Sequence, residues 1–373
     1  MAKLRQLIAY LERVAPPALQ LSYDNSGLLV GDADLEVEGV LVSLDCTEEI
    51  VAEAVREGCN VVVAHHPIIF GGLKRLTGRT YVERAVIRAI REGVALYAIH
   101  TNLDSVLRRG VNGRIAERLG LERVRTLAPA ADTLQKLAVY VPREHTDAVA
   151  EALFSAGAGQ IGDYDQASFR VPGTGTFRPL DGARPAVGAV GAEERVAEDR
   201  LEVLVPRVLA KAALAAARRA HPYEEVAYDL IDVHAEHPDF GLGAVGELPE
   251  AMAHEDWLEY LCDCMELDYV RATAPTGKPV RRVAVCGGAG QSLLRQARSA
   301  GADAYVTSDF KYHEYFDAEG RLVVCDVGHY ESERFTVNLL YELISSRFDT
   351  FAARMTSRDT NPVRLFLPTG SPH

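Results

Sequence analysis

Three short apolar runs each end in side chains that can bind a metal ion. The runs are residues 61–64, 96–99 and 323–326, and the side chains that follow them are His65, His66, Asp104, His329 and Glu333. Runs of this kind predict buried parallel strands, whose carboxyl ends meet at one edge of a sheet. We therefore expect these five side chains to come together at one site.

The spacing within the groups predicts two neighbouring metal positions. His65 and His66 are adjacent, so both can reach one site only beyond the strand end, where Pro67 keeps His66 extended. Two imidazoles presented in this way suit two adjacent ions better than one. His329 and Glu333 are four apart at the start of a predicted helix, which places them on the same face. The carboxylate can then bridge two ions while the imidazole binds one of them.

Three imidazoles and two carboxylates form a mixed nitrogen and oxygen ligand set. Such a set suits zinc, iron, manganese, cobalt or nickel, and differs from the thiolate set of a zinc finger. We expect two divalent ions per chain, because five ligands exceed what one tetrahedral ion with an open position takes. A single buried histidine is more often a hydrogen-bonded core residue, so the prediction depends on the five residues together.

Two further polar residues near these groups have more than one interpretation. His100 lies four positions before Asp104, and either orients a metal ligand or makes a structural hydrogen bond after its strand. Glu331 lies two positions from both His329 and Glu333, so a helix points it away from them. We expect Glu331 to be a solvated acid.

Other segments carry groups that are compatible with either binding or a structural role. Lys311 and His313 follow another predicted strand, and either contact an anionic substrate or begin a surface helix. The run Gly287-Gly288-Ala289-Gly290 has the glycines to cradle a phosphate. It lacks the lysine and the serine or threonine of a P-loop, so a tight turn is favoured. Residues 24–27 have the composition of a turn, and we expect a structural role for them.

The elements that position these residues alternate between helix and strand in both outer parts of the chain. Such alternation predicts parallel α/β sheets. From about residue 134 to 233 the predicted order is instead βαββαβ, which is the order of a ferredoxin-like unit. We therefore expect an α/β protein of three domains: an N-terminal α/β lobe at 1–126, an inserted ferredoxin-like α+β domain at 127–245 and a C-terminal α/β lobe at 246–373.

The composition argues against several classes of protein. The 373 residues carry 40 Lys and Arg against 53 Asp and Glu, a net charge of −13 that opposes binding to nucleic acid. A small anionic or nucleotide substrate still fits such a chain if its pocket is locally cationic. No N-terminal signal peptide and no membrane-spanning stretch is evident, so we expect a cytoplasmic protein that does not enter the membrane. Six scattered cysteines predict core thiols.

Four segments of the chain resemble the signature segments of a known family. They are residues 22–31, 64–67, 100–104 and 328–333, and they resemble the GTP cyclohydrolase I type 2 homologue family, also called NIF-three-like. The resemblance implies a NIF-three-like fold and a dinuclear metal site at the five residues named above, with Glu333 as the bridge. Some members carry a PII-like insert, which residues 221–229 resemble. The resemblance also implies a ring-shaped homohexamer with its metal sites facing the interior.

Two functions of different class follow from these features. The first is a dinuclear-metal hydrolase, and the family name implies GTP as the substrate, with water opening the imidazole ring of guanine. The alternative is a non-catalytic metal-binding, metal-delivery or regulatory protein with a ligand-sensing insert. The sequence identifies neither a guanine pocket nor a general acid or base, so both functions stand at this point.

Overall fold

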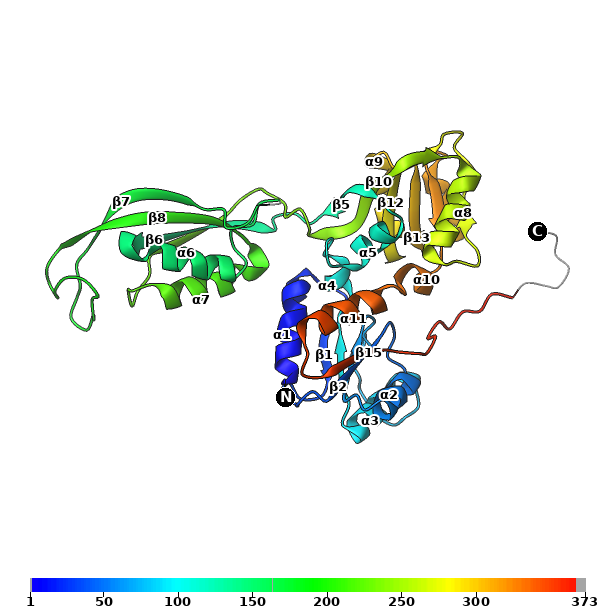
Figure 1. The fold of residues 1–373 in the computed structure, drawn as a ribbon, viewed down its shortest axis with the longest axis horizontal. Coiled ribbons are helices and arrows are strands. Elements are labelled where there is room, and N and C mark those ends of the chain that lie inside the picture. Colours follow the sequence, from blue (N-terminus) through cyan, green and yellow to red (C-terminus); the bar gives the residue numbers. More distant parts are fainter. Residues whose placement is uncertain (1, 163, 367–373) are drawn as a thin grey trace. The chain divides into compact units, whose positions relative to one another are not determined.

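The computed structural model describes residues 2–162 and 164–366, and its chain divides into two units (Figure 1). Unit 1 combines Met1–Ala128 with Gly241–His373, and unit 2 is Pro129–Phe240. The end of the expected C-terminal lobe, residues 367–373, lies outside the described residues. Within them, three sheets and eleven α-helices form a mixed α/β protein, which confirms the fold class at that level.

The first sheet of unit 1 is built from the apolar runs of the N-terminal part. Its strands, in spatial order, are β1 (Gly27–Val30), β4 (Ala95–Ala98), β3 (Val61–Ala64), β2 (Gly39–Ser43) and β15 (Ala352–Met355). β4, β3, β2 and β15 are parallel, and β1 pairs with β4 in the antiparallel sense. β2, β3 and β4 are buried along their whole length, as continuous apolar runs require.

Helices cover this sheet and hold its edge in place. α2 (Glu48–Arg56) and α3 (Tyr81–Glu92) lie side by side and share a core with the sheet, whereas α11 (Thr336–Arg347) contacts β2 and β15 (Figure 1). α1 (Leu4–Val14) buries one apolar stripe of leucines. The short α4 (Thr101–Asp104) follows β4 directly.

The second sheet of unit 1 contains six strands. Their order is β11 (Arg271–Ala272), β14 (Val323–Asp326), β13 (Ala304–Ser308), β12 (Val280–Ala289), β10 (Gly241–Met252) and β5 (Glu122–Pro129). β12, β13 and β14 are parallel, so their carboxyl ends share one edge. The helices of this half are α5 (Val111–Arg118), α8 (His254–Met265), α9 (Leu294–Ser299) and α10 (His329–Glu333).

Unit 2 has one antiparallel sheet and two helices that pack together against it. Along the chain its elements are β6 (Leu134–Pro142), α6 (Thr146–Ser155), β7 (Phe169–Phe177), β8 (Glu194–Pro206), α7 (Ala210–Ala220) and β9 (Tyr228–Asp232). The spatial order of the strands is β7-β8-β6-β9. Apolar side chains of β6, β8, α6 and α7 form a separate core.

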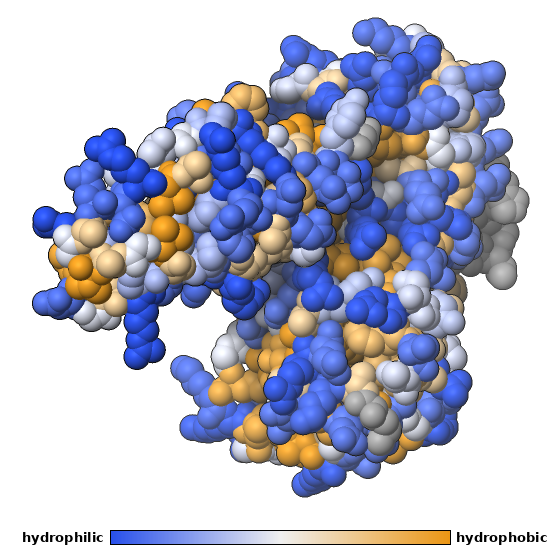
Figure 2. Space-filling view, turned by 60° about the vertical axis from the view of Figure 1, so that its left-hand side comes forward, coloured by the Kyte–Doolittle hydropathy of each residue, from blue (hydrophilic) through white to orange (hydrophobic). Residues whose placement is uncertain are grey.

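None of the helices in the described ranges combines the length and the apolar character needed to cross a bilayer. Hydrophilic side chains cover most of the face seen in Figure 2, and apolar patches lie between them.

Candidate metal centre

The five predicted ligands come together in unit 1, between its two sheets. β3 leads directly into His65 and His66, and Asp104 is the last residue of α4. His329 and Glu333 are the first and last residues of α10, which follows β14. α4 and α10 both lie in the space between the sheets (Figure 1). Ligand atoms of these residues form groups in which all atoms lie within 4.8 Å of one another.

The two oxygens of the Glu333 carboxylate face different partners. Oε1 lies 3.8 Å from His65 Nε2, which is 3.6 Å from Asp104 Oδ1. Oε2 lies 2.9 Å from His66 Nε2 and 3.2 Å from His329 Nε2. We call His65, Asp104 and Glu333 Oε1 the inner triad, and His66, His329 and Glu333 Oε2 the outer triad. One carboxylate therefore stands between two groups of metal-type ligands.

The inner triad contains buried polar atoms without partners. His65 is fully buried, and neither its Nε2 nor Oδ1 of Asp104 makes a hydrogen bond within the described residues. An unpaired buried polar atom costs roughly 1–3 kcal/mol, so such atoms are uncommon in folded proteins. A divalent cation would satisfy both atoms at once. The side chains of the inner triad thus fit a metal ion.

Each histidine of the two triads is oriented through its Nδ1. The acceptors facing His65, His66 and His329 are the carbonyl oxygen of Ile99 at 2.8 Å, Oδ1 of Asp45 at 2.8 Å and Oδ2 of Asp309 at 2.7 Å. When the Nδ1 proton is donated to these acceptors, each Nε2 turns a lone pair toward the centre. This is the usual arrangement of metal-binding histidines, whose second nitrogen donates to a carboxylate or a carbonyl.

Asp45 and Asp309 are site residues that the sequence analysis did not single out. Asp45 lies two residues after β2, and Asp309 directly follows β13, so an acid at a strand end is the signal that identifies them. Asp309 has a φ of 62°, which is uncommon for a residue other than glycine and is tolerated by aspartate. Lys311 and His313 instead begin a 3-10 helix (Tyr312–Ala318), which is the structural alternative, and neither is among the described residues that line the cavity at the centre. The segment after β13 therefore contributes Asp309 in their place.

The ionisable groups of the two triads have shifted pKa values. Burial, and then the nearby Glu333 carboxylate, raise the pKa of Asp104 to about 8. Burial opposes ionisation of Glu333 too, but hydrogen bonds from the histidines outweigh it and hold the Glu333 pKa well below its usual range. Hydrogen bonds to carboxylates outweigh burial at His66 and His329 as well, raising their pKa values to about 10 and about 9. Two carboxyl groups that are buried side by side repel one another when both are ionised. A bound cation would relieve this repulsion.

The glycine run, whose first three residues end β12, makes room for Glu333. A Cβ atom on Gly288 would lie 2.4 Å from Glu333 Oε1, and Gly288 has a φ of 63°. The backbone N–H groups of Gly287, Gly288 and Gly290 donate to side chains of Asn112, Ser332 and Thr307. These donors are engaged, so the run does not cradle a phosphate. The tight conformation serves the close approach of the carboxylate.

His100 stands beside the triads as a fourth histidine. Its ring centroid lies 5.3 Å from that of His65 and 5.4 Å from that of His66, and its Nδ1 lies 2.8 Å from Asp24 Oδ1. Although burial opposes ionisation of Asp24, hydrogen bonds from His100 and Thr101 hold the pKa of that carboxyl well below its usual range. Asp24 therefore supports the site, whereas the turn lies at residues 22–23 and Gly27 begins β1, so the expected turn at 24–27 was misplaced.

Glu331 lies outside both triads, as its register predicts. It is only partly exposed, and its Oε1 accepts a hydrogen bond from Asn361 Nδ2 at 2.8 Å. Glu331 thus points away from the triads as expected, but it is solvated only in part. The cause is the segment after β15, which passes this side of α10 and could not be located from sequence periodicity.

A cavity of about 400 Å³ opens onto the centre. Its lining includes His66, Asp104, His329 and Glu333 together with aromatic rings of Tyr23 and Phe70. These two rings are 6.1 Å apart and are each more than half exposed, so they stand at the outer part of the cavity. The volume falls within the range of small-molecule sites.

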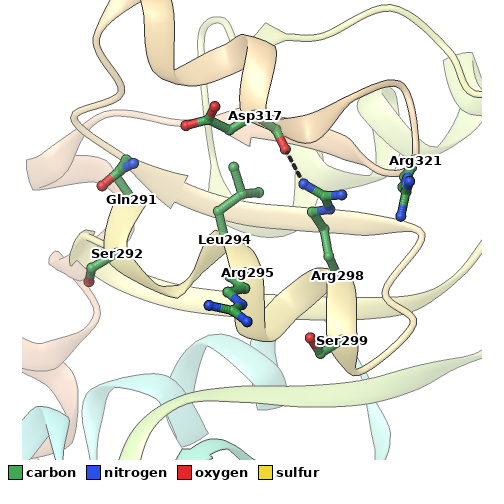
Figure 3. Close-up of a pocket in the computed structure, with 8 residues that line it drawn as sticks. All are labelled: Gln291, Ser292, Leu294, Arg295, Arg298, Ser299, Asp317 and Arg321. Atoms are coloured by element: carbon green, nitrogen blue, oxygen red, sulfur yellow. Dashed lines mark hydrogen bonds between the residues drawn. The ribbon is translucent and has the colours of Figure 1, made fainter.

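A second hollow of unit 1, of about 600 Å³, lies beside α9 and is lined by arginines (Figure 3). Arg298 donates to the carbonyl oxygen of Asp317 at 2.7 Å and pairs with Glu319. Arg321 also pairs with Glu319. The guanidinium groups of Arg295, Arg298 and Arg321 do not converge on one point in Figure 3. The chemistry of unit 1 is therefore concentrated at the triads.

Comparisons with known proteins match nearly the whole chain. The family model of Duf34/NIF3 (NGG1p interacting factor 3) matches residues 2–362. A Bacillus subtilis (strain 168) protein named GTP cyclohydrolase 1 type 2 homolog is 38% identical over 363 residues, covering 96% of this chain and 97% of that protein. A Mycobacterium tuberculosis protein of the same name is 39% identical over 376 residues, covering 99% and 98%.

Solved structures include a similar protein from Bacillus cereus, described as related to NIF3. It superposes with a TM-score of 0.85 at 36% identity, and the match covers 98% of this chain and 99% of that one. Sequence and fold thus agree over nearly the whole length. The chain belongs to the Duf34/NIF3 family.

Proposed function

We propose that this protein binds two divalent metal ions per chain and acts as a metal-dependent hydrolase. His65 and Asp104 would hold one ion, His66 and His329 the other, and Glu333 would bridge them. The observation that carries this proposal is the orientation of Glu333, whose two oxygens face two different triads. Zinc, iron, manganese, cobalt and nickel all suit the ligands.

When bound, a pair of divalent ions activates water as a nucleophile at neutral pH and polarises the bond under attack. The chain supplies the surrounding groups. Asp45 and Asp309 fix the imidazoles of His66 and His329, and burial of Glu333 excludes competing water from the bridge. The ring of His100 lines the cavity, where it would give a proton to, or take one from, a bound substrate.

The substrate class follows from the relatives' names and from the cavity. The relatives are named as homologues of GTP cyclohydrolase 1 type 2, so we propose a purine nucleotide such as GTP, with water opening the imidazole ring of guanine. Tyr23 and Phe70 offer aromatic faces for stacking at the outer part of the cavity. Activated water close to a stacked base is the arrangement that this reaction needs.

Metal analysis combined with an activity assay tests the proposal. Elemental analysis after chelator-free purification and loading should find about two ions per chain, because five ligands exceed the needs of one open site. A nucleotide panel should then show metal-dependent turnover with at least one purine nucleotide. Two bound ions without turnover would assign the protein to the metal-delivery or regulatory class. No bound metal would reject both functions.

A His100→Gln variant defines the role of that histidine. If His100 carries a proton, the variant retains two ions per chain and loses turnover by roughly 10²–10⁴-fold, the usual contribution of general acid–base catalysis. A drop in the metal count would instead make His100 a ligand.

We also propose the three-domain division stated above, with unit 2 as the core of an inserted ferredoxin-like, PII-like domain. The βαββαβ order of unit 2 and its strand order β7-β8-β6-β9 support this assignment. We further propose a cytoplasmic homo-oligomer, since most oligomers are closed and symmetric and can enclose a metal site. Six subunits are proposed only because the family resemblance implies a hexamer. Light scattering across a salt series tests the assembly, and a monomer mass in every condition would refute it.

A further inference from the structure

Unit 2 contains a cavity of about 620 Å³ that the metal chemistry does not use. One end of β7 and the residues after it, up to Ala186, form one wall. The opposite wall comes from β6, β8 and the segment between α7 and β9. Its lining is mainly apolar and aromatic, with a few polar groups among them, which is the usual character of a small-molecule site.

A buried carboxylate lies in this cavity. Glu198, on β8, is 8% exposed, and no basic side chain of the described residues forms an ion pair with its carboxylate. A Cβ atom on Gly175 would lie 2.2 Å from Glu198 Oε2, so glycine at that position leaves space for the carboxylate. A buried acid without a cationic partner is costly, and a cationic ligand would relieve that cost.

An aromatic hydroxyl lies beside this acid. The Tyr223 hydroxyl is buried beside the Glu198 carboxylate, and burial, followed by the interaction with Glu198, raises its pKa to about 12. The ring of Tyr223 packs against that of Phe177 at 5.8 Å between centroids. Together these groups offer a polar end and an aromatic wall.

His221 holds Tyr223 in this position. It is 7% exposed, its Nε2 donates to the carbonyl oxygen of Tyr140 at 2.9 Å, and its Nδ1 accepts from the backbone N–H of Tyr223 at 3.1 Å. Burial lowers the pKa of His221, so the ring acts as a neutral support. The segment His221-Pro222-Tyr223-Glu224-Glu225 is thus built to present Tyr223 to the cavity.

The charged side chains that line the cavity favour a positively charged ligand. The described lining residues include three carboxylates, Glu198, Glu224 and Glu225, against one guanidinium, Arg178. Glu224 Oε1 accepts from the backbone N–H of Arg184 at 2.8 Å, so it is partly engaged. Glu198 is then the buried acid that remains for a ligand. An ammonium group would meet its carboxylate and the faces of Tyr223 and Phe177.

We propose that unit 2 binds a small organic cation, an amine carried on an apolar and preferably aromatic body, with the amine at Glu198 and the body against Phe177 and Tyr223. This site does not depend on the metal centre or on the hydrolase proposed above. Its failure would leave the metal function untouched, and loss of the metal function would leave this site in place.

Calorimetric titration of the full chain with three indoles tests the proposal. Tryptamine, tryptophol and indole-3-acetate share one ring and differ in charge. Tryptamine should bind saturably and about tenfold tighter than tryptophol, because one charge-assisted contact is worth roughly this factor. Indole-3-acetate should bind weakest. Absence of saturable tryptamine binding, or equal affinity for the three probes, would overturn the proposal.

Glu198→Gln and Glu225→Gln form a matched pair of variants. Glu198→Gln should remove the tenfold preference for tryptamine and leave tryptophol binding unchanged, whereas the exposed Glu225 contributes less than about twofold because solvent screens it. Equal losses in both variants would indicate non-specific attraction and overturn the assignment. If Glu198→Gln does not fold, Gly175→Ala provides the same test, since its methyl group would displace the carboxylate. Retention of the preference in Gly175→Ala would contradict the site.

Discussion

The inner and outer triads share the Glu333 carboxylate but differ in the hydrogen bonds that their polar atoms make. In the outer triad, Glu333 Oε2 lies within hydrogen-bond distance of both His66 and His329, which are 21% and 41% exposed. In the inner triad the contacts are 3.6 and 3.8 Å long, His65 is fully buried, and two polar atoms have no partner in the described chain. Hydrogen bonds therefore join the ligands of the outer triad directly, whereas no contact of hydrogen-bond length joins those of the inner triad. We infer that the inner position would hold a metal ion more firmly than the outer one.

The largest expected effect comes from the carboxylate that both triads share. Glu333→Gln should weaken both metal positions by more than about 100-fold, the upper end for loss of a supporting contact, because an amide bridges two cations poorly. Glu331→Gln is the matched control on the same helix and should keep both ions. Elemental analysis after dialysis gives the counts. Equal metal loss in the two variants would show that the register of α10 is misassigned.

A methyl group in the glycine run should disturb the bridge almost as strongly. Gly288→Ala places a Cβ atom 2.4 Å from Glu333 Oε1, so the carboxylate must move and the metal count should fall below one. Gly277→Ala is the control, because Gly277 has a similar φ of 75° and open space around it. Both variants carry backbone strain of about 1–3 kcal/mol. Only the first should lose metal, and equal metal counts would contradict the steric role of Gly288.

Removing one histidine from each triad separates the two positions. His65→Gln and His329→Gln should each retain about one ion per chain, as three-ligand positions lose occupancy when one ligand is removed. The ion remaining in His329→Gln occupies the inner triad and should resist a chelator longer than the ion remaining in His65→Gln. Time courses of metal removal measure this difference. Equal rates would refute the inferred ranking of the triads.

Smaller effects on metal affinity are expected from the carboxylates that hydrogen-bond to the histidines of the outer triad. Asp45→Asn and Asp309→Asn should each weaken the outer position by about 10–100-fold and spare the inner one, because these acids orient His66 and His329. Asp317→Asn, at an exposed acid outside the centre, is the control. Competition titrations with a metal-binding dye give the affinities. Weakening of the inner position alone would reverse the assignment.

Deleting residues 130–239 should leave both triads unchanged. Ala130 donates to the carbonyl oxygen of Phe240 at 2.9 Å, so the ends of the deleted segment are adjacent and a short Gly/Ser linker can join them. All proposed ligands lie outside this segment, and the shortened chain should still bind about two ions. A soluble product without metal would show that unit 2 contributes to the centre.

Local pattern was sufficient to predict much of the fold and the five residues of the triads. Regular apolar stripes predict helices at residues 48–56 and 81–92, and these ranges coincide with the observed bounds of α2 and α3. The pattern at residues 332–346 predicts one helix, but the structure divides this region between α10 and α11. The strands β1, β5, β10, β11 and β15 were missed. β10 is rich in glycine, and β15 pairs with β2 from more than 300 residues away, so no local pattern identifies them.

The supporting residues of the centre were harder to predict for the same reason. Asp45, Asp309 and Gly288 act on ligands that are distant in sequence, and only the packing of the two sheets brings them together. His100 was identified as ambiguous, but its partner Asp24 was assigned only to a turn. Spacing identifies ligands that share a strand end or a helix face, whereas partners from other strands require the three-dimensional structure.

Anomalous diffraction from metal-loaded crystals tests the central claim most directly. Data collected at the absorption edge of the bound metal should show two peaks per chain, on either side of the Glu333 carboxylate and about 3.5–4 Å apart. One peak should lie beside His65 and Asp104, and the other beside His66 and His329. A single peak, or two peaks that Glu333 does not bridge, would contradict the dinuclear centre.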